Sequence, residues 1–239
     1  MRNGLRLAAG IAMGFGVVAL ASAVATAIPG VGRFINARAW LTTGDVIQFV
    51  FFSASLVLMV TLSRGRVSSY GLRGVGGRDI RRVTVVAGSV GAAIGLLSAA
   101  ASMAGARPGG GPLSDTSSFL EIVVSVWIAA SVSEEMLFRG LIQGFLEPLR
   151  TRTFRLFGCR VSLPVAVAAI GFGLVHLGLL STTRPPMVAG IVVSATVLGF
   201  IAGHFRERTG SIVPAILAHV LFNVLGSGIP MLASSILSG

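Results

Sequence analysis

The stretch Ser133-Glu134-Glu135-Met136-Leu137-Phe138-Arg139-Gly140 places two carboxylates and a guanidinium inside an apolar run that extends from Phe119 to Leu146. The run is long enough to cross a bilayer, because about 20 apolar residues in a helix span the hydrocarbon core. A charge at the centre of a membrane helix costs about 2.5–3.5 kcal/mol on insertion scales, so such charges are paired and mark functional sites. The stretch therefore predicts a membrane helix that carries a candidate site.

The composition of the whole chain indicates a polytopic membrane protein. Of its 239 residues, 54% are hydrophobic and 11% are charged, whereas soluble domains carry about 25% charged residues. The mean hydropathy is +0.88. We expect an all-α fold, a polytopic membrane helix bundle with about 7–8 transmembrane helices. The expected spans are 5–28, 46–62, 83–106, 119–146, 161–180, 187–203 and 211–226, and residues 228–239 are a partial eighth helix.

The arginines cluster in the loops between the apolar runs, which favours the positive-inside rule over nucleic-acid binding. All 19 basic residues are arginines, and with a cytoplasmic N terminus 14 of them fall in cytoplasmic segments and four in external loops. We therefore expect an integral membrane protein in a lipid bilayer, with its N terminus in the cytoplasm and no nucleic-acid partner. The absence of lysine fits a GC-rich bacterial genome and hence a bacterial plasma membrane. Ala25-Thr26-Ala27 matches a signal-peptide cleavage site, but we favour an uncleaved first helix because the apolar run is long.

Polar residues on three expected spans fall at similar depths. At about 1.5 Å rise per residue, Glu134 lies about 20 Å from the cytoplasmic end of its span and His176 about 22 Å from the cytoplasmic end of the next. His219 and Asn223 lie about 12 and 18 Å into the last long span. Polar groups inside a bilayer need partners within the protein, so we expect these four side chains to meet.

The two glutamates of the opening stretch point in different directions. Glu135 and Arg139 are four residues apart with the acid first, which is the favourable orientation for a helical ion pair. Glu134 is rotated about 100° from Glu135 around the helix axis. We therefore expect a supporting ion pair between Glu135 and Arg139, with Glu134 left available for chemistry.

A free carboxylate with two imidazoles and an amide is a usable hydrolytic set. Burial raises the pKa of a glutamate toward that of a general base near neutral pH, and an adjacent imidazole can orient a water molecule. A second histidine and an asparagine can donate to a developing oxyanion. This combination suffices for peptide hydrolysis without a covalent intermediate.

Two other classes of function fit the same residues. Glu134 and the histidines could relay protons in a proton-coupled membrane transporter, or the polar cluster could hold together a non-catalytic membrane scaffold. We see no convincing repeat that relates the two halves of the chain, which weakens a transporter built on internal repeats. Full cleavage of a substrate peptide by a Glu134→Gln variant would exclude the peptidase. Proton-coupled flux in liposomes that the same change abolishes would support the transporter, and a Glu134→Ala variant with raised stability and no phenotype would support the scaffold.

Three motifs in chain order resemble those of the CPBP family of CAAX proteases and bacteriocin-processing enzymes, also called the type II CAAX prenyl endopeptidase or ABI-domain family. They are Glu134-Glu135-x-x-x-Arg139, Phe172-x-x-x-His176 and His219-x-x-x-Asn223. The resemblance divides the chain into N-terminal transmembrane helices at 1–118 with about three spans, a CPBP-like intramembrane protease core at 119–226 and a short C-terminal apolar segment at 227–239.

The resemblance implies an intramembrane endopeptidase that acts on a peptide or prenylated-protein substrate, and we expect its site to open toward the cytoplasm. It implies that Glu134 and His176 activate the attacking water, that His219 and Asn223 form the oxyanion site, and that Glu135 and Arg139 support the helix. Substrate-binding residues and the oligomeric state are left open. Members are often described as metalloproteases, and Glu134, His176 and His219 would be the zinc ligands if a metal is present. We favour the mechanism without a metal or other cofactor, because the chain has no H-E-x-x-H motif.

Overall fold

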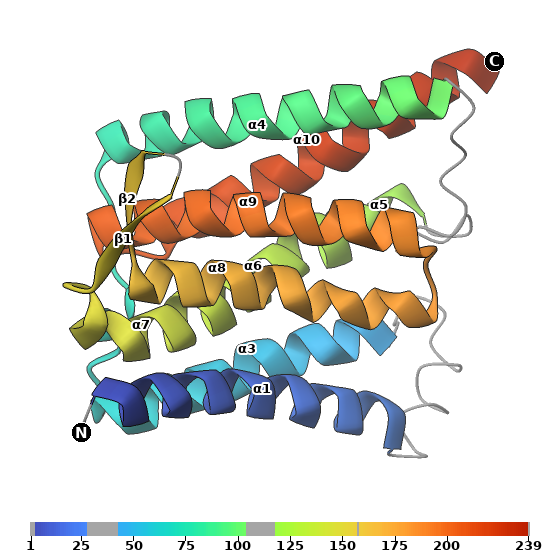
Figure 1. Ribbon diagram of the computed structural model, residues 1–239. Helices are drawn as coiled ribbons and strands as arrows, with labels where there is room; N and C mark the ends of the chain where they lie inside the picture. Colours follow the sequence, from blue (N-terminus) through green and yellow to red (C-terminus); the bar gives the residue numbers. More distant parts are fainter. Residues whose placement is uncertain (1–2, 28–42, 104–117, 157, 239) are drawn as a thin grey trace.

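The computed structural model describes residues 3–27, 43–103, 118–156 and 158–238, and these form a bundle of long helices that lie side by side (Figure 1). The N terminus lies at one end of the bundle and the C terminus at the other. The long helices are α1 (Asn3–Ala27), α3 (Thr43–Ser63), α4 (Gly77–Met103), α8 (Leu163–Val175), α9 (Pro185–Thr209) and α10 (Val213–Ser238). Short helices η1 (Val67–Tyr70) and η5 (His176–Ser181) follow α3 and α8.

The segment that carries the opening stretch is built from alternating helix types. It comprises α5 (Phe119–Glu121), the π-helix η2 (Ile122–Ala130), α6 (Ser131–Glu135), the π-helix η3 (Met136–Ile142), α7 (Gln143–Leu146) and the 3₁₀ turn η4 (Glu147–Leu149). Backbone dihedrals stay helical at each junction, so the path is continuous. It begins with a capping box, in which the side chains of Ser118 and Glu121 satisfy each other's backbone amides.

Among the described residues, six helices are long and apolar enough to cross a membrane. They support the expected bundle of membrane helices, while the count of seven to eight is not confirmed. The segment from Phe119 to Leu146 is not among the six. The partial eighth helix expected at 228–239 is the continuation of α10, which runs unbroken to Ser238 with Pro230 inside it.

Two basic segments expected to be loops are regular structure. Residues 204–209 complete α9, which ends at Gly210 in a left-handed conformation with φ of 67°. Strands β1 (Thr153–Leu156) and β2 (Cys159–Ser162) pair antiparallel, although we expected a loop up to Arg160 in an all-α fold. The hairpin lies at the end of the bundle where α8 begins, outside the long helices (Figure 1).

Small residues set the closest helix contacts. A side chain at Gly91 of α4 would meet the Cα of Phe222 in α10 at 3.1 Å, and one at Gly95 would clash with the carbonyl oxygen of Leu225. The two backbones therefore touch, as glycines four residues apart allow in membrane helices. The core of the bundle lies around η3, of which all seven residues are buried.

Candidate active site

Glu134 is held by a glutamine from a different helix. The Nε2 of Gln48 in α3 donates to Glu134 Oε1 at 2.7 Å. The amide oxygen of Gln48 accepts a hydrogen bond from the hydroxyl of Ser133, the residue before Glu134. These two bonds fix the orientation of the amide, because a carboxylate accepts and cannot donate. The Glu134 side chain is 12% exposed, so it is neither sealed in the core nor free in solvent.

His219 of α10 lies between the two glutamates. Its Nδ1 is 3.0 Å from Glu135 Oε1, and its Nε2 is 3.8 Å from Glu134 Oε2. Since an ionised Glu135 only accepts, Nδ1 carries a proton and donates to it. The other ring nitrogen then faces Glu134 across a gap too long for a direct hydrogen bond. The imidazole of His219 thus lies between the carboxylate of Glu135 and the carboxylate of Glu134.

Glu135 and Arg139 form a buried ion pair. The distance from Arg139 Nη1 to Glu135 Oε1 is 2.9 Å, and both side chains are completely buried. The guanidinium also lies over the ring of Phe172, with 4.5 Å between Cζ and the ring centroid. Three buried atoms of the pair, Glu135 Oε2 and Arg139 Nε and Nη2, have no hydrogen-bond partner among the described residues. The pair therefore depends on one short contact and on the aromatic face.

His176 has a fixed tautomer and a free ring nitrogen. Its Nδ1 is 2.8 Å from the carbonyl oxygen of Phe172. A carbonyl only accepts, so Nδ1 carries the proton and Nε2 is the ring nitrogen available for chemistry. The Phe172 ring contacts both histidines edge-on, with centroids 5.1 Å from His176 and 5.3 Å from His219. Phe172 therefore packs against both imidazoles and Arg139.

Asn223 binds the backbone of the central segment. Its Nδ2 donates to the carbonyl of Val126 at 3.1 Å and to the hydroxyl of Ser131 at 3.2 Å. These bonds tie α10 to η2 and to the start of α6, directly before the glutamates. Both amide hydrogens are therefore engaged, and Asn223 would have to release one of them to bind an oxyanion.

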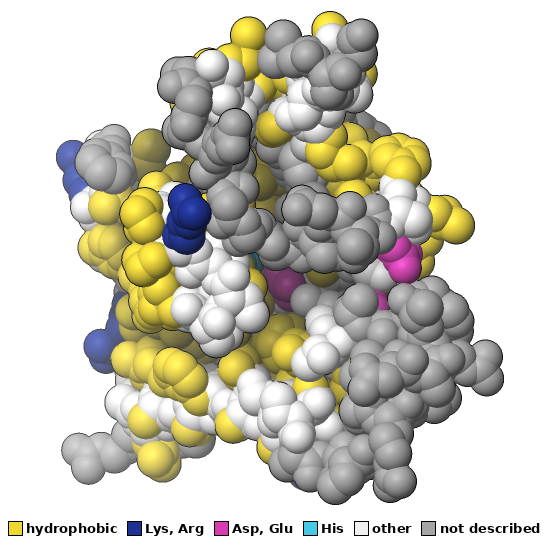
Figure 2. Space-filling model, turned by 90° about the vertical axis from the view of Figure 1, so that its right-hand side faces the viewer, with side chains coloured by type: hydrophobic (Ala, Val, Ile, Leu, Met, Phe, Trp, Pro, Cys, Tyr) yellow, Lys and Arg dark blue, Asp and Glu magenta, His cyan; other side chains and the backbone are white. Residues whose placement is uncertain are grey.

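One end of the bundle has a recess in its surface. Figure 2 shows an acidic side chain set back between the helices, with part of a histidine beside it, on the end of the bundle that lies to the right in Figure 1. This end is opposite the N terminus. An acid and an imidazole are therefore accessible from outside the bundle.

Comparison with known proteins identifies the central part of the chain. Residues 116–225 match the family model described as type II CAAX prenyl endopeptidase Rce1-like. The chain carries an Rce1-like CAAX protease domain. This agrees with the family resemblance of the three motifs. No curated protein and no solved structure matches the chain.

The Rce1-like domain contains all six residues that the sequence singled out. Glu134, Glu135, Arg139 and His219 are in direct contact or at ion-pair distance, and Asn223 lies one turn of α10 beyond His219. His176 joins them through Phe172 and has no hydrogen bond to Glu134 in this structure.

The zinc alternative does not fit this arrangement. Within the described ranges, no group of three or more His, Cys, Asp or Glu side chains is placed to hold a metal ion. Glu134, His176 and His219 are therefore not assembled as a ligand set in this structure.

The sequence reasoning missed Gln48. It lies in the α3 span, which precedes the Rce1-like domain match, so the three motifs cannot indicate it. The available signal is a polar amide within an apolar run, which needs a partner inside the membrane. Part of the candidate site is therefore supplied by the N-terminal helices.

Proposed function

We propose that this protein is an intramembrane endopeptidase that hydrolyses peptide bonds of membrane-associated proteins with Glu134 as the general base. The observation that supports this best is that the two glutamates have different partners. Glu135 is neutralised by Arg139 and holds His219, whereas Glu134 accepts from the neutral Gln48 and faces His219 across a 3.8 Å gap. A carboxylate without a cation in hydrogen-bond contact can accept a proton from water.

In the proposed reaction, water lies between Glu134 and the scissile carbonyl. Glu134 takes one proton from this water as the oxygen attacks the carbonyl carbon, and the carbonyl oxygen becomes an oxyanion. When the C–N bond breaks, the protonated Glu134 returns the proton to the leaving amine. The products are a carboxylic acid and an amine, and Glu134 is ionised again. A positioned base of this kind contributes about 10²–10⁴-fold.

The other residues are assigned by their contacts. Nε2 of His176 is the free ring nitrogen, and it orients the water together with Glu134. Nε2 of His219, next to Glu134, donates to the oxyanion when the ring is protonated. The proposed role of Asn223 is to position η2 and α6, because its donors already bind Val126 and Ser131. Glu135 and Arg139 fix the orientation of His219.

The proposed substrate is a membrane protein with a prenylated CAAX-type C terminus, in keeping with the name of the matching family, type II CAAX prenyl endopeptidase. If the N terminus is cytoplasmic, as the arginine distribution indicates, the recessed acid in Figure 2 faces away from the cytoplasm. This differs from the cytoplasmic opening that we expected from the sequence. Labelling single cysteines placed in the α1–α3 and α9–α10 connections, in a Cys159→Ser background, determines which end of the bundle is cytoplasmic.

The proposal is tested with the purified full-length protein in liposomes and a farnesylated CAAX peptide, with both products followed by mass spectrometry. Glu134→Gln should reduce cleavage by about 10²–10⁴-fold. Glu121→Gln is the matched control, because it makes the same change in the same helical segment and glutamine also completes a capping box. Equal cleavage by the wild-type and Glu134→Gln proteins would rule out Glu134 as the base.

A further inference from the structure

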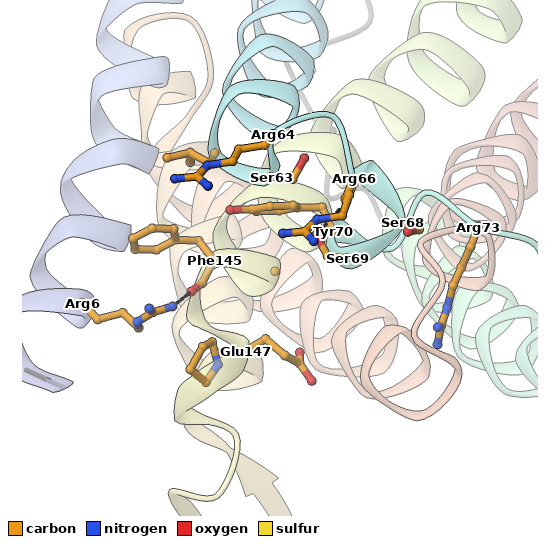
Figure 3. Close-up of a pocket in the computed structure, with 13 residues that line it drawn as sticks. Arg6, Ser63, Arg64, Arg66, Ser68, Ser69, Tyr70, Arg73, Phe145 and Glu147 are labelled. Atoms are coloured by element: carbon orange, nitrogen blue, oxygen red, sulfur yellow. Dashed lines mark hydrogen bonds between the residues drawn. The ribbon is translucent and has the colours of Figure 1, made fainter. Parts of the chain in front are cut away.

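A basic cavity lies between the helices at the end of the bundle where the chain begins. Its volume is about 860 Å³. Arg6 of α1, Arg64 and Arg66 of the α3–η1 turn, and Arg73 after η1 line it, together with Tyr70 and Phe145 (Figure 3). Figure 3 shows the guanidinium groups of Arg6, Arg64 and Arg66 around the Tyr70 and Phe145 rings. Segments far apart in the sequence therefore form one positively charged cavity.

One carboxylate, that of Glu147, also lines the cavity, but it forms its ion pairs with Arg150 and Arg206 and not with the cavity arginines. Three acids at this end are already paired with arginines that do not line the cavity: Asp79 with Arg82 and Arg208, Glu147 with Arg150 and Arg206, and Glu207 with Arg150. Arg6 donates to the carbonyl of Phe145 at 3.0 Å and Arg73 to that of Thr209 at 2.8 Å. In the described part of the chain, none of the four cavity arginines has a carboxylate within ion-pair distance. The cavity therefore carries four arginines and one carboxylate that is already paired elsewhere, and this net positive charge favours binding of an anion.

The lining favours phosphate over other anions. Guanidinium groups present forked N–H donors that match phosphate oxygens, and several of them converge here from different segments. The Tyr70 side chain adds a hydroxyl to the same wall. Leu62, Phe145 and Pro148 give the cavity an apolar part beside the charges. An occupant with a phosphate and an adjoining apolar portion matches both.

The depth of the cavity favours a lipid as the source of that phosphate. It lies where α1 begins and α3 ends, which is the level of the headgroups if these helices cross the bilayer. Basic pockets between membrane helices bind anionic headgroups, and each arginine near the surface contributes to the attraction. We propose that this cavity binds the phosphate of an anionic phospholipid. The bound lipid contacts α1, the α3–η1 turn and the α7–η4 segment and so stabilises their packing. The proposal is independent of the protease activity.

The test measures lipid retention by the full-length protein after delipidation in a neutral detergent. Native mass spectrometry follows the binding of phosphatidylglycerol, with phosphatidylcholine as the zwitterionic comparison. The variant Arg64→Gln/Arg66→Gln removes two exposed cavity arginines, and Arg152→Gln/Arg155→Gln removes two exposed arginines at or beside the hairpin, outside the cavity. At about fivefold per arginine, the cavity variant should bind phosphatidylglycerol about 25-fold more weakly. The hairpin variant and phosphatidylcholine binding should be unchanged.

Two results would overturn the proposal. Equal weakening in the cavity and hairpin variants would show a general attraction to the basic face and no site. Displacement of phosphatidylglycerol by excess inorganic phosphate would show that the arginines take a soluble anion and that the lipid is not the occupant. Thermal unfolding of Arg6→Gln provides a second readout, since phosphatidylglycerol should raise the Tm of this variant less than that of the wild type.

Discussion

Removing Arg139 should be among the most destabilising single changes in this protein. Both members of the ion pair are completely buried, and the contact between Nη1 and Oε1 is 2.9 Å. Two unit charges about 4 Å apart interact by about 4 kcal/mol at an effective dielectric constant of 20. Breaking a buried pair by removing one partner costs about 3–5 kcal/mol, because the remaining charge is left uncompensated. We expect Arg139→Met to lower the free energy of unfolding by that amount, since only His219 remains to bind Glu135.

The assay is equilibrium unfolding in mixtures of SDS and a neutral detergent, followed by circular dichroism. The double variant Glu135→Gln/Arg139→Met is the decisive comparison, because it removes both charges and keeps an oxygen that accepts from His219. Replacing a buried pair by neutral groups is often close to neutral in stability, so most of the loss should be recovered. The reasoning would be refuted if Arg139→Met unfolded like wild type, or if the double variant were no more stable than the single one.

Three further predictions test separate parts of the structure. Gln48→Leu should leave the fold intact and reduce kcat/KM about 10- to 100-fold. The substitution removes the hydrogen bond from Gln48 to Glu134, and a hydrogen bond to a charged group contributes about 1.5–3 kcal/mol. Unchanged kinetics would show that Gln48 is not part of the site. Gly95→Ala should destabilise the α4–α10 contact, whereas Gly88→Ala, whose methyl group meets a side chain only at 4.0 Å, should not; equal SDS midpoints would contradict this. Burial raises the pKa of Tyr70 above its usual 10.0, and the charge of Arg6 partly lowers it. The tyrosinate absorbance of this single tyrosine should therefore have its midpoint above pH 10, and at a still higher pH in Arg6→Gln. Stability should accordingly be level below pH 10 and fall as the pH rises, and a tyrosinate midpoint below 10 would refute the assignment.

The long helices could be predicted from the sequence because each apolar run is unbroken and of membrane-spanning length. The end of α9 could not, since its last turns carry charges that the sequence alone assigns to a loop. Arg206 lies within the helix, and its guanidinium forms an ion pair with Glu147 at 2.7 Å. The hairpin could not be predicted, because each of its two strands has only four residues. This length is too short for a clear alternation of apolar and polar residues.

Within the site, spacing along one helix was enough to predict the contact of Glu135 with Arg139. Contacts between helices depend on rotation and axial shift, which spacing does not determine. His219 therefore contacts Glu135 as well as facing Glu134, and Gln48 of a distant helix supplies a donor that no motif indicated. The π-helical turns on either side of α6 also change which residues of this segment share a face.

The central claim is that Glu134 is the base of a peptidase, and the most direct test is profiling of protein termini in cells. Strains that express the wild type, Glu134→Gln or Glu121→Gln at equal levels are compared by mass spectrometry of newly formed peptide ends. New termini on membrane proteins should appear with the wild type and Glu121→Gln and be absent with Glu134→Gln. Identical termini in the Glu134→Gln and wild-type strains would contradict the account.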